Sequence, residues 1–176
     1  MTMRPEPNEY APYYDRYIRL VPVGDIVSVL EEQGRGTAAL LSSISNEQAE
    51  FRYAPDKWTV KQVLGHVTDT ERIFAYRALR ISRKDATPIE GFEQDDYVRY
   101  GPFAASKMPD LVDDFVAVRR ATVGLLRRLE AEAWLRRGTA NRNEVTVRAL
   151  AYCIAGHELH HLAILKDKYR LVGQAL

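Results

Sequence analysis

The residues of this chain that are best suited to chemistry are histidines near its C-terminal end. His157 and His161 lie four positions apart in the stretch GHELHHL, residues 156–162. Residues four apart on a helix share one face, so two imidazoles placed in this way can bind one metal ion. The spacing is also that of the H-E-x-x-H motif of zinc metalloproteases, in which Glu158 would serve as the general base.

The rest of the chain argues against such a metalloprotease, because those enzymes take their third ligand from downstream. The fifteen residues after His161 contain no His and no Glu, and Asp167 is poorly spaced to share an ion with His161. A third ligand must therefore come from upstream, where His66 is the only histidine. His66 and His157 are 91 positions apart, so the fold has to bring them together.

Length and composition indicate one domain. The chain has 176 residues, of which 46% are hydrophobic and 28% charged, as in ordinary globular proteins. We expect residues 1–176 to form a single unit, with 1–23 as an N-terminal extension and 24–170 as a helical bundle. A net charge of +1 gives no strong field for nucleic acid or an anionic membrane.

Location is predicted from what the sequence contains. Cys153 is the only cysteine, which rules out an intramolecular disulfide, and residues 1–8 are polar and proline-containing, unlike a secretory leader. The longest apolar run, residues 149–155, falls far short of the ~20 needed to cross a bilayer. We therefore expect a cytoplasmic protein without a membrane span.

Apolar periodicity predicts four helices and no clear strand. The first follows Asp25, a suitable N-cap, and covers about residues 26–44. The second opens with a capping box formed by Thr59 and Gln62, and its pattern puts His66 near the edge of a buried stripe. The third should run from about Pro109 to near residue 136, before a glycine.

The fourth predicted helix opens near Thr146 and carries the histidine pair on one face. Prolines and glycines between residues 82 and 107 predict a loop that is long enough to be functional. A histidine on the second helix facing a pair on the fourth describes a four-helix bundle with a metal site between its helices.

At this point the residues resemble those of a known family. The stretch DKWTVKQVLGHVTDTE, residues 56–71, is similar to the signature of the DinB/YfiT-like superfamily, in which a Trp-Ser/Thr helix start precedes a metal-binding His. The spacing of His157 and His161 matches that family's second ligand pair. The resemblance covers about residues 25–170. It implies an all-α, up-down-down-up four-helix bundle with a long connection between helices two and three, often a homodimer, and a divalent ion such as nickel or zinc bound by His66, His157 and His161.

The resemblance leaves the reaction open. Characterised relatives include S-transferases and isomerases that use bacillithiol or mycothiol, and others are assigned as metal-dependent hydrolases or stress-induced proteins. Three imidazoles leave a divalent ion with an open position, as in catalytic sites. We expect a metal-dependent enzyme acting on a small molecule, first by transfer of a low-molecular-weight thiol and second by hydrolysis with metal-activated water. A third hypothesis is a non-catalytic, stress-related metal-binding module.

Two carboxylates are candidates for acid or base, or for orienting an imidazole. Glu158 points about 100° around the helix from His157, and Asp69 lies three residues beyond His66. His160 is rotated by a similar angle from His161, which favours a role outside the ligand set. The loop mixes aromatic and acidic residues that could cover a pocket, namely Phe92, Asp95, Asp96, Tyr97 and Tyr100.

Arginine pairs on the third predicted helix raise the alternative of nucleic-acid binding. They include Arg119 with Arg120 and Arg127 with Arg128. Acidic residues intersperse with them, and there is no nucleic-acid motif, so we expect a solvated helix face and no nucleic-acid partner.

Overall fold

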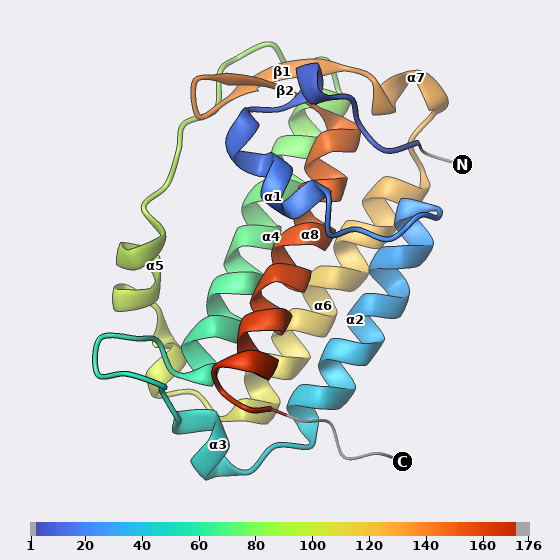
Figure 1. Ribbon diagram of the computed structural model, residues 1–176. Helices are drawn as coiled ribbons and strands as arrows, with labels where there is room; N and C mark the ends of the chain where they lie inside the picture. The colour runs from blue at the N-terminus through green and yellow to red at the C-terminus, as the bar shows by residue number, and fades with distance from the viewer. Residues whose placement is uncertain (1–2, 172–176) are drawn as a thin grey trace.

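Four long helices form the body of the protein in the computed structural model, which describes residues 3–171 (Figure 1). They are α2 (Ile26–Ser42), α4 (Val60–Ser82), α6 (Met108–Arg127) and α8 (Val147–Asp167). Helices α4 and α6 run in one direction, and α2 and α8 run in the other (Figure 1). Helix α4 packs on α8 and α6, and α2 packs on α6 and α8. The predicted all-α, up-down-down-up bundle is therefore confirmed. Within residues 3–171, no helix has both the length and the apolar character needed to span a membrane.

Local capping explains where three of these helices begin. The side chains of Asp25 and Thr146 each accept a first-turn backbone N–H at 3.1 Å. Thr59 and Gln62 form the predicted capping box: the Gln62 N–H donates to Thr59 Oγ1 at 3.2 Å and the Thr59 N–H donates to Gln62 Oε1 at 2.9 Å. The predicted starts of α2, α4 and α8 are confirmed because these signals depend only on neighbouring residues.

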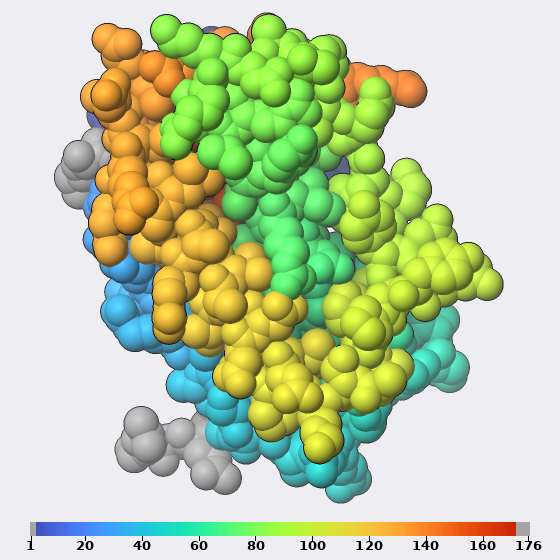
Figure 2. Space-filling model, turned by 180° about the vertical axis from the view of Figure 1, so that it is seen from behind, coloured from blue at the N-terminus to red at the C-terminus, as the bar shows by residue number. Residues whose placement is uncertain are grey.

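The connection between α4 and α6 is long because the two helices are parallel. The 23 residues of α4 span about 34 Å, and the chain must return over that length before α6 begins. Residues 83–107 do this along one edge of the bundle, coloured green to yellow in Figure 2. The sequence predicted a loop here, but the segment contains α5 (Gln94–Tyr100) and the short 3-10 helix η3 (Pro102–Ala104). Both pack on α4, with Val98 and Phe103 buried.

The third long helix is shorter than the sequence predicted. Helix α6 ends at Arg127 rather than near residue 136, and a short helix α7 (Ala131–Trp134) follows. No glycine or proline stands at residues 128–130, so the sequence contains no local stop signal. The break allows Ala133 and Trp134 to be buried, with α7 packed on α8.

A two-stranded antiparallel hairpin precedes α8 and corrects the expectation of no strand. Strands β1 (Arg137–Ala140) and β2 (Asn143–Thr146) are joined by Asn141 and Arg142, whose φ angles are 49° and 63°. Two left-handed residues are what a tight type I′ turn requires, but arginine is not a residue that signals it. The backbone of Ile89 adds two hydrogen bonds, of 2.9 Å to Thr139 and 2.8 Å from Asn141.

The N-terminal segment packs on the bundle. It contains the 3-10 helices η1 (Pro7–Glu9) and η2 (Pro12–Tyr14) and the helix α1 (Asp15–Ile18), while α3 (Asn46–Glu50) links α2 to α4. Helix α1 lies across α8, where the backbone of Tyr17 comes so close to Gly156 that any side chain there would overlap it. Glu9 anchors the segment through an ion pair with Arg148 and a 2.7 Å hydrogen bond from Thr146.

The core is divided into two apolar clusters by a polar layer at the middle of the bundle. One cluster contains Leu30, Phe74, Leu126 and Leu150, and the other contains Leu41, Leu64, Phe115 and Leu165. Between these levels, each of the four long helices contributes buried polar side chains. They are Thr37 on α2, His66, Thr70 and Glu71 on α4, Arg119 and Thr122 on α6, and His157 and Glu158 on α8.

Candidate metal centre

Three imidazoles from two helices meet in the polar layer. His66 Nε2 lies 3.0 Å from His157 Nε2, which in turn lies 3.2 Å from His161 Nε2. One ligand atom from each of the three residues falls within 4.8 Å of the others. The structure therefore brings the upstream histidine on α4 to the pair on α8, as the sequence required.

Two of the separations between these nitrogens, 3.0 Å from His66 to His157 and 3.2 Å from His157 to His161, are those expected for ligands of a single ion. Imidazole nitrogens at ~2.1 Å from one ion, with tetrahedral to octahedral angles, are separated by ~3.0 to 3.4 Å. Hydrogen bonding explains the arrangement less well, because a ring nitrogen carries one hydrogen or one lone pair. His157 Nε2 has two imidazole neighbours and can satisfy only one of them in that way.

Burial keeps these imidazoles neutral, which is the state in which they bind metal. Burial lowers the pKa of His66 to about 4. Burial, with a contribution from the neighbouring imidazoles, lowers the pKa of His161 to about 3 and that of His157 well below its ordinary value. All three rings present lone pairs rather than positive charge to the centre near neutral pH.

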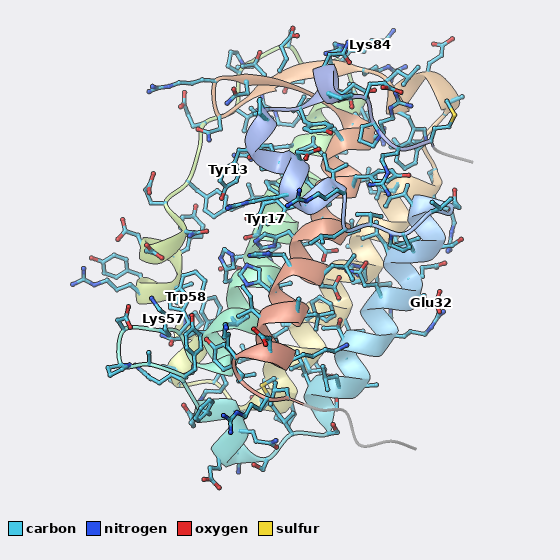
Figure 3. All side chains as sticks on the ribbon, in the orientation of Figure 1. Tyr13, Tyr17, Glu32, Lys57, Trp58 and Lys84 are labelled. Atoms are coloured by element: carbon cyan, nitrogen blue, oxygen red, sulfur yellow. The ribbon has the colours of Figure 1, made fainter. Side chains whose placement is uncertain are left out.

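Aromatic rings hold the imidazoles in place. The Trp58 ring lies 4.8 Å from that of His66, and the Tyr17 ring lies 5.4 Å from that of His157 in an edge-on arrangement. Figure 3 shows Tyr17 on α1 and Trp58 just before α4. His160 contacts the Tyr17 ring at 5.3 Å and is not one of the three converging groups.

Glu158 faces away from the imidazoles into an ion-pair network. Its Oε2 accepts from Arg119 Nη2 at 2.6 Å, and its Oε1 accepts from Thr37 Oγ1 at 2.5 Å. Burial raises the pKa of Glu158, and the Arg119 guanidinium opposes that rise. Arg119 also binds both carboxylate oxygens of Glu71 and donates to the Leu30 carbonyl at 2.8 Å. The network joins all four long helices.

This network corrects the expectation for the arginine-rich helix. Arg119 is only 5% exposed, whereas Arg120 and Arg127 are exposed as predicted. Gly34 makes room for it, because a Cβ at that position would lie 2.9 Å from Arg119 Cγ. The sequence showed a run of charges but not which member the bundle would bury.

Asp69 is also engaged elsewhere. Its Oδ1 accepts from Arg72 Nη1 at 2.8 Å, and Arg72 also binds Asp114 on α6. Neither carboxylate that the sequence offered as an acid or base is therefore free in this structure. Among the described residues, the histidine set converges and the acidic candidates belong to ion pairs.

A cavity of about 380 Å³ opens beside the imidazoles. His66 and His157 form part of its wall, together with residues from the N-terminal segment, α4, the α4–α6 connection and the hairpin. These are Ala11, Tyr13, Tyr14, Tyr17, Thr70, Phe74, Arg77, Phe92, Glu93, Gln94, Asp95, Asn141 and Asn143. Of the loop residues expected to cover a pocket, Phe92 and Asp95 line it, whereas Asp96, Tyr97 and Tyr100 are exposed and do not.

Sequence reasoning missed the N-terminal wall of this cavity. Tyr10, Tyr13, Tyr14 and Tyr17 fall within eight residues, a concentration of aromatic side chains that could have marked the segment as packed. Sequence reasoning also missed Arg77, which lies on the same stripe of α4 as His66. Its position eleven residues, or about three turns, from His66 was the available signal.

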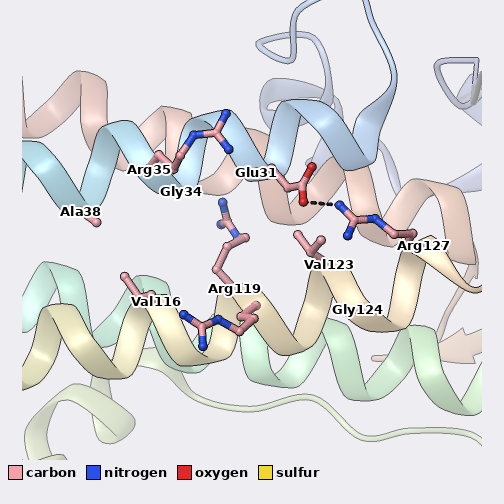
Figure 4. Close-up of a pocket in the computed structure, with 10 residues that line it drawn as sticks. Glu31, Gly34, Arg35, Ala38, Val116, Arg119, Val123, Gly124 and Arg127 are labelled. Carbon is pink, nitrogen blue, oxygen red and sulfur yellow. Dashed lines mark hydrogen bonds and ion pairs between the residues drawn. The ribbon is translucent and has the colours of Figure 1, made fainter.

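A second cavity, of about 540 Å³, lies between α2 and α6 and contains no histidine (Figure 4). Its floor includes Val116 and Val123, and an ion pair between Glu31 and Arg127 crosses one end. It is separate from the metal centre, whose imidazoles come from α4 and α8.

Comparisons with known proteins agree with this architecture. The family profile of the DinB superfamily matches residues 30–165. No curated protein matches the sequence. Among solved structures, YfiT from Bacillus subtilis is 17% identical, with a TM-score of 0.75 over 96% of this chain and 92% of that one. It is described as a probable metal-dependent hydrolase with an unusual four-helix bundle topology.

A mycothiol-dependent maleylpyruvate isomerase is also similar in structure. It is 12% identical, with a TM-score of 0.65 over 82% of this chain and 61% of the isomerase. At such identities these two likenesses show a shared fold.

Proposed function

We propose that this chain, which belongs to the DinB superfamily, binds one divalent metal ion through His66, His157 and His161 and is a metal-dependent enzyme for a small-molecule substrate. The observation that carries the proposal is the convergence of three Nε2 atoms, from buried His66 and His157 and half-buried His161, with neighbours at 3.0 and 3.2 Å, beside a cavity of about 380 Å³. Neutral imidazole ligands suit both nickel and zinc.

An open coordination position distinguishes a catalytic ion from a structural one, which is usually enclosed by four protein ligands. Within the described residues, the ligand cluster contains three side chains, and no carboxylate or thiol joins it. When bound, the ion would supply Lewis acidity and would favour the ionised form of a thiol or of water. The adjoining cavity supports an enzyme over a non-catalytic module.

Transfer of a low-molecular-weight thiol is our first choice of reaction, and hydrolysis is the second. Hydrolysis benefits from a general base close to the imidazoles. Glu158 and Asp69 are held by arginines, and the carboxylates that line the cavity, Glu93 and Asp95, are exposed. A thiol that ionises on the metal needs no such base, so this set of side chains favours S-transfer. A homodimer and a cytoplasmic location stay predictions.

The test is the metal content of purified protein by mass spectrometry, for the parent and three histidine variants. His66→Ala and His161→Ala should each weaken metal binding by more than the roughly 10- to 100-fold typical of losing an outer partner of a ligand. His160→Ala is the matched control and should bind like the parent. Tight binding by His66→Ala would refute a site shared between α4 and α8.

The same samples address stability and reaction. Removing the ion should lower the melting temperature, because an ion that binds only the folded state stabilises it by about 2.7 kcal/mol at a hundredfold excess over Kd. Adding thiols to cobalt-substituted protein should produce thiolate charge-transfer absorption if S-transfer is correct. A cobalt absorption spectrum that no added thiol changes would favour hydrolysis.

A further inference from the structure

One side chain of the cavity wall, that of Arg77, is a buried cation that forms no ion pair with any described residue. Arg77 lies on α4 about three turns beyond His66, and Thr70 and Phe74 occupy the turns between them. The Arg77 guanidinium carbon lies 5.5 Å from the centre of the Phe74 ring. Side chains on a helix tilt towards its N-terminus, so the guanidinium reaches back along the cavity in the direction of the imidazoles.

The guanidinium has unused capacity for binding. Arg77 is 2% exposed, yet within residues 3–171 no carboxylate forms an ion pair with it. Its Nη2 donates to the Glu90 carbonyl at 2.9 Å, and its Nε has no hydrogen-bond partner. The Tyr14 hydroxyl is a hydrogen-bonding neighbour of the guanidinium, but burial raises the pKa of that phenol, which is therefore neutral and does not balance the charge.

Thr70, which also lines this cavity, has a second buried polar atom without a partner among the described residues. Thr70 is 3% exposed, and its Oγ1 makes no hydrogen bond. A helical threonine usually bonds the carbonyl four residues earlier, as Thr68 does to Leu64 at 2.9 Å. Buried donors are rarely left unpaired in folded proteins, so two in one cavity wall point to a ligand.

We infer that this cavity binds a substrate with a carboxylate, which Arg77 holds through its free Nε edge while the other end of the molecule reaches the imidazoles. The inference rests on the proposed function for the imidazole end only. Phe74 and Tyr14 would contact an apolar stem between the two ends, and Thr70 would bond a polar atom near the imidazoles. Among the cavity walls the exposed acids Glu93 and Asp95 disfavour a dianion, which argues for a single carboxylate over a phosphate.

The experiment compares ω-mercaptocarboxylates of three to six carbons with the amides of the same chains. Calorimetry on cobalt-substituted protein measures their affinities, and thiolate absorption reports independently whether sulfur reaches the metal. The parent should bind the best acid about 10- to 100-fold more tightly than its amide, as expected for a hydrogen-bonded charge. Arg77→Met should abolish that preference. The matched control Arg120→Met, an exposed arginine that does not line this cavity, should keep it.

Three results would overturn the inference: equal binding of acid and amide by the parent, a preference that survives Arg77→Met, and an unchanged preference in Arg77→Lys. The lysine variant keeps the charge and loses the Nε donor, so the preference should fall several-fold even if the methionine variant does not fold. Acid preference without thiolate absorption would refute S-transfer and leave the anion site standing. Thiolate absorption without acid preference would do the reverse.

Discussion

Replacing Arg119 by methionine should destabilise this protein more than replacing any exposed arginine. The side chain donates five hydrogen bonds, to Glu71, Glu158 and the Leu30 carbonyl. Methionine fills much of the same space but leaves two buried carboxylates without a cation. Breaking a buried pair in this way typically costs about 3–5 kcal/mol. For a chain of this length, that loss lowers the melting temperature by roughly 6–20 °C.

The assay is urea unfolding followed by far-UV circular dichroism, with and without added metal ion. Arg120→Met is the control, since it changes the next residue in the sequence to the same side chain at an exposed position. It should alter the free energy of unfolding by less than about 0.5 kcal/mol. Substituting Glu71→Gln and Glu158→Gln in the Arg119→Met background should recover part of the loss, because the stranded charges are removed.

A loss of less than about 1 kcal/mol for Arg119→Met would refute this reasoning, because the carboxylates would then not depend on the guanidinium. The same variants separate two roles for Glu158. If it belongs to the network, Glu158→Gln should keep its metal affinity close to that of the parent. A large loss of metal affinity in Glu158→Gln with normal stability would instead indicate that Glu158 contributes to the metal site.

Two further predictions concern packing and pH. Gly156→Ala should destabilise the protein by a few kcal/mol, because the new Cβ would overlap the Tyr17 backbone. In the control Gly36→Ala the new Cβ meets nothing within 4 Å, so this variant should stabilise α2 by about 0.5–1 kcal/mol. Urea midpoints that shifted equally in the two variants would contradict this prediction. Metal-free protein should lose stability as the pH falls from ~6.5 towards 4. In the unfolded chain His66 and His161 become protonated over this range, whereas in the folded protein they stay neutral because their pKa values are about 4 and 3. The loss should be on the order of 3 kcal/mol per histidine, and a flat urea midpoint between pH 7 and 5 would show that these imidazoles are not buried and neutral.

Short-range signals account for what the sequence determined. The starts of α2, α4 and α8 are set by caps at Asp25, Thr59 and Thr146, each of which depends on residues in the next turn. The i,i+4 spacing of His157 and His161 fixes that they share a face. The need for an upstream partner then selected His66, since the chain contains four histidines in all.

Where α6 ends and the hairpin forms could not be predicted in the same way. Residues 128–130 contain no helix-breaking signal. Arg142 adopts a left-handed backbone conformation, and an arginine does not predict one. Burial of Trp134 against the other helices, rather than local preference, decides the break.

Only the tertiary structure decided which charged residues are buried and what they bind. Arg119 and Arg120 are adjacent and chemically identical, yet the first lies in the core with partners 48 and 39 residues away and the second faces solvent. Glu158 has the spacing of a catalytic base, but its carboxylate is bound by Arg119 on another helix. Arg77 became a candidate for anion binding only because no carboxylate within residues 3–171 forms an ion pair with it. The sequence by itself determines residue types and local spacing, whereas partners and desolvation depend on how the helices pack, because both are set by contacts between distant parts of the chain.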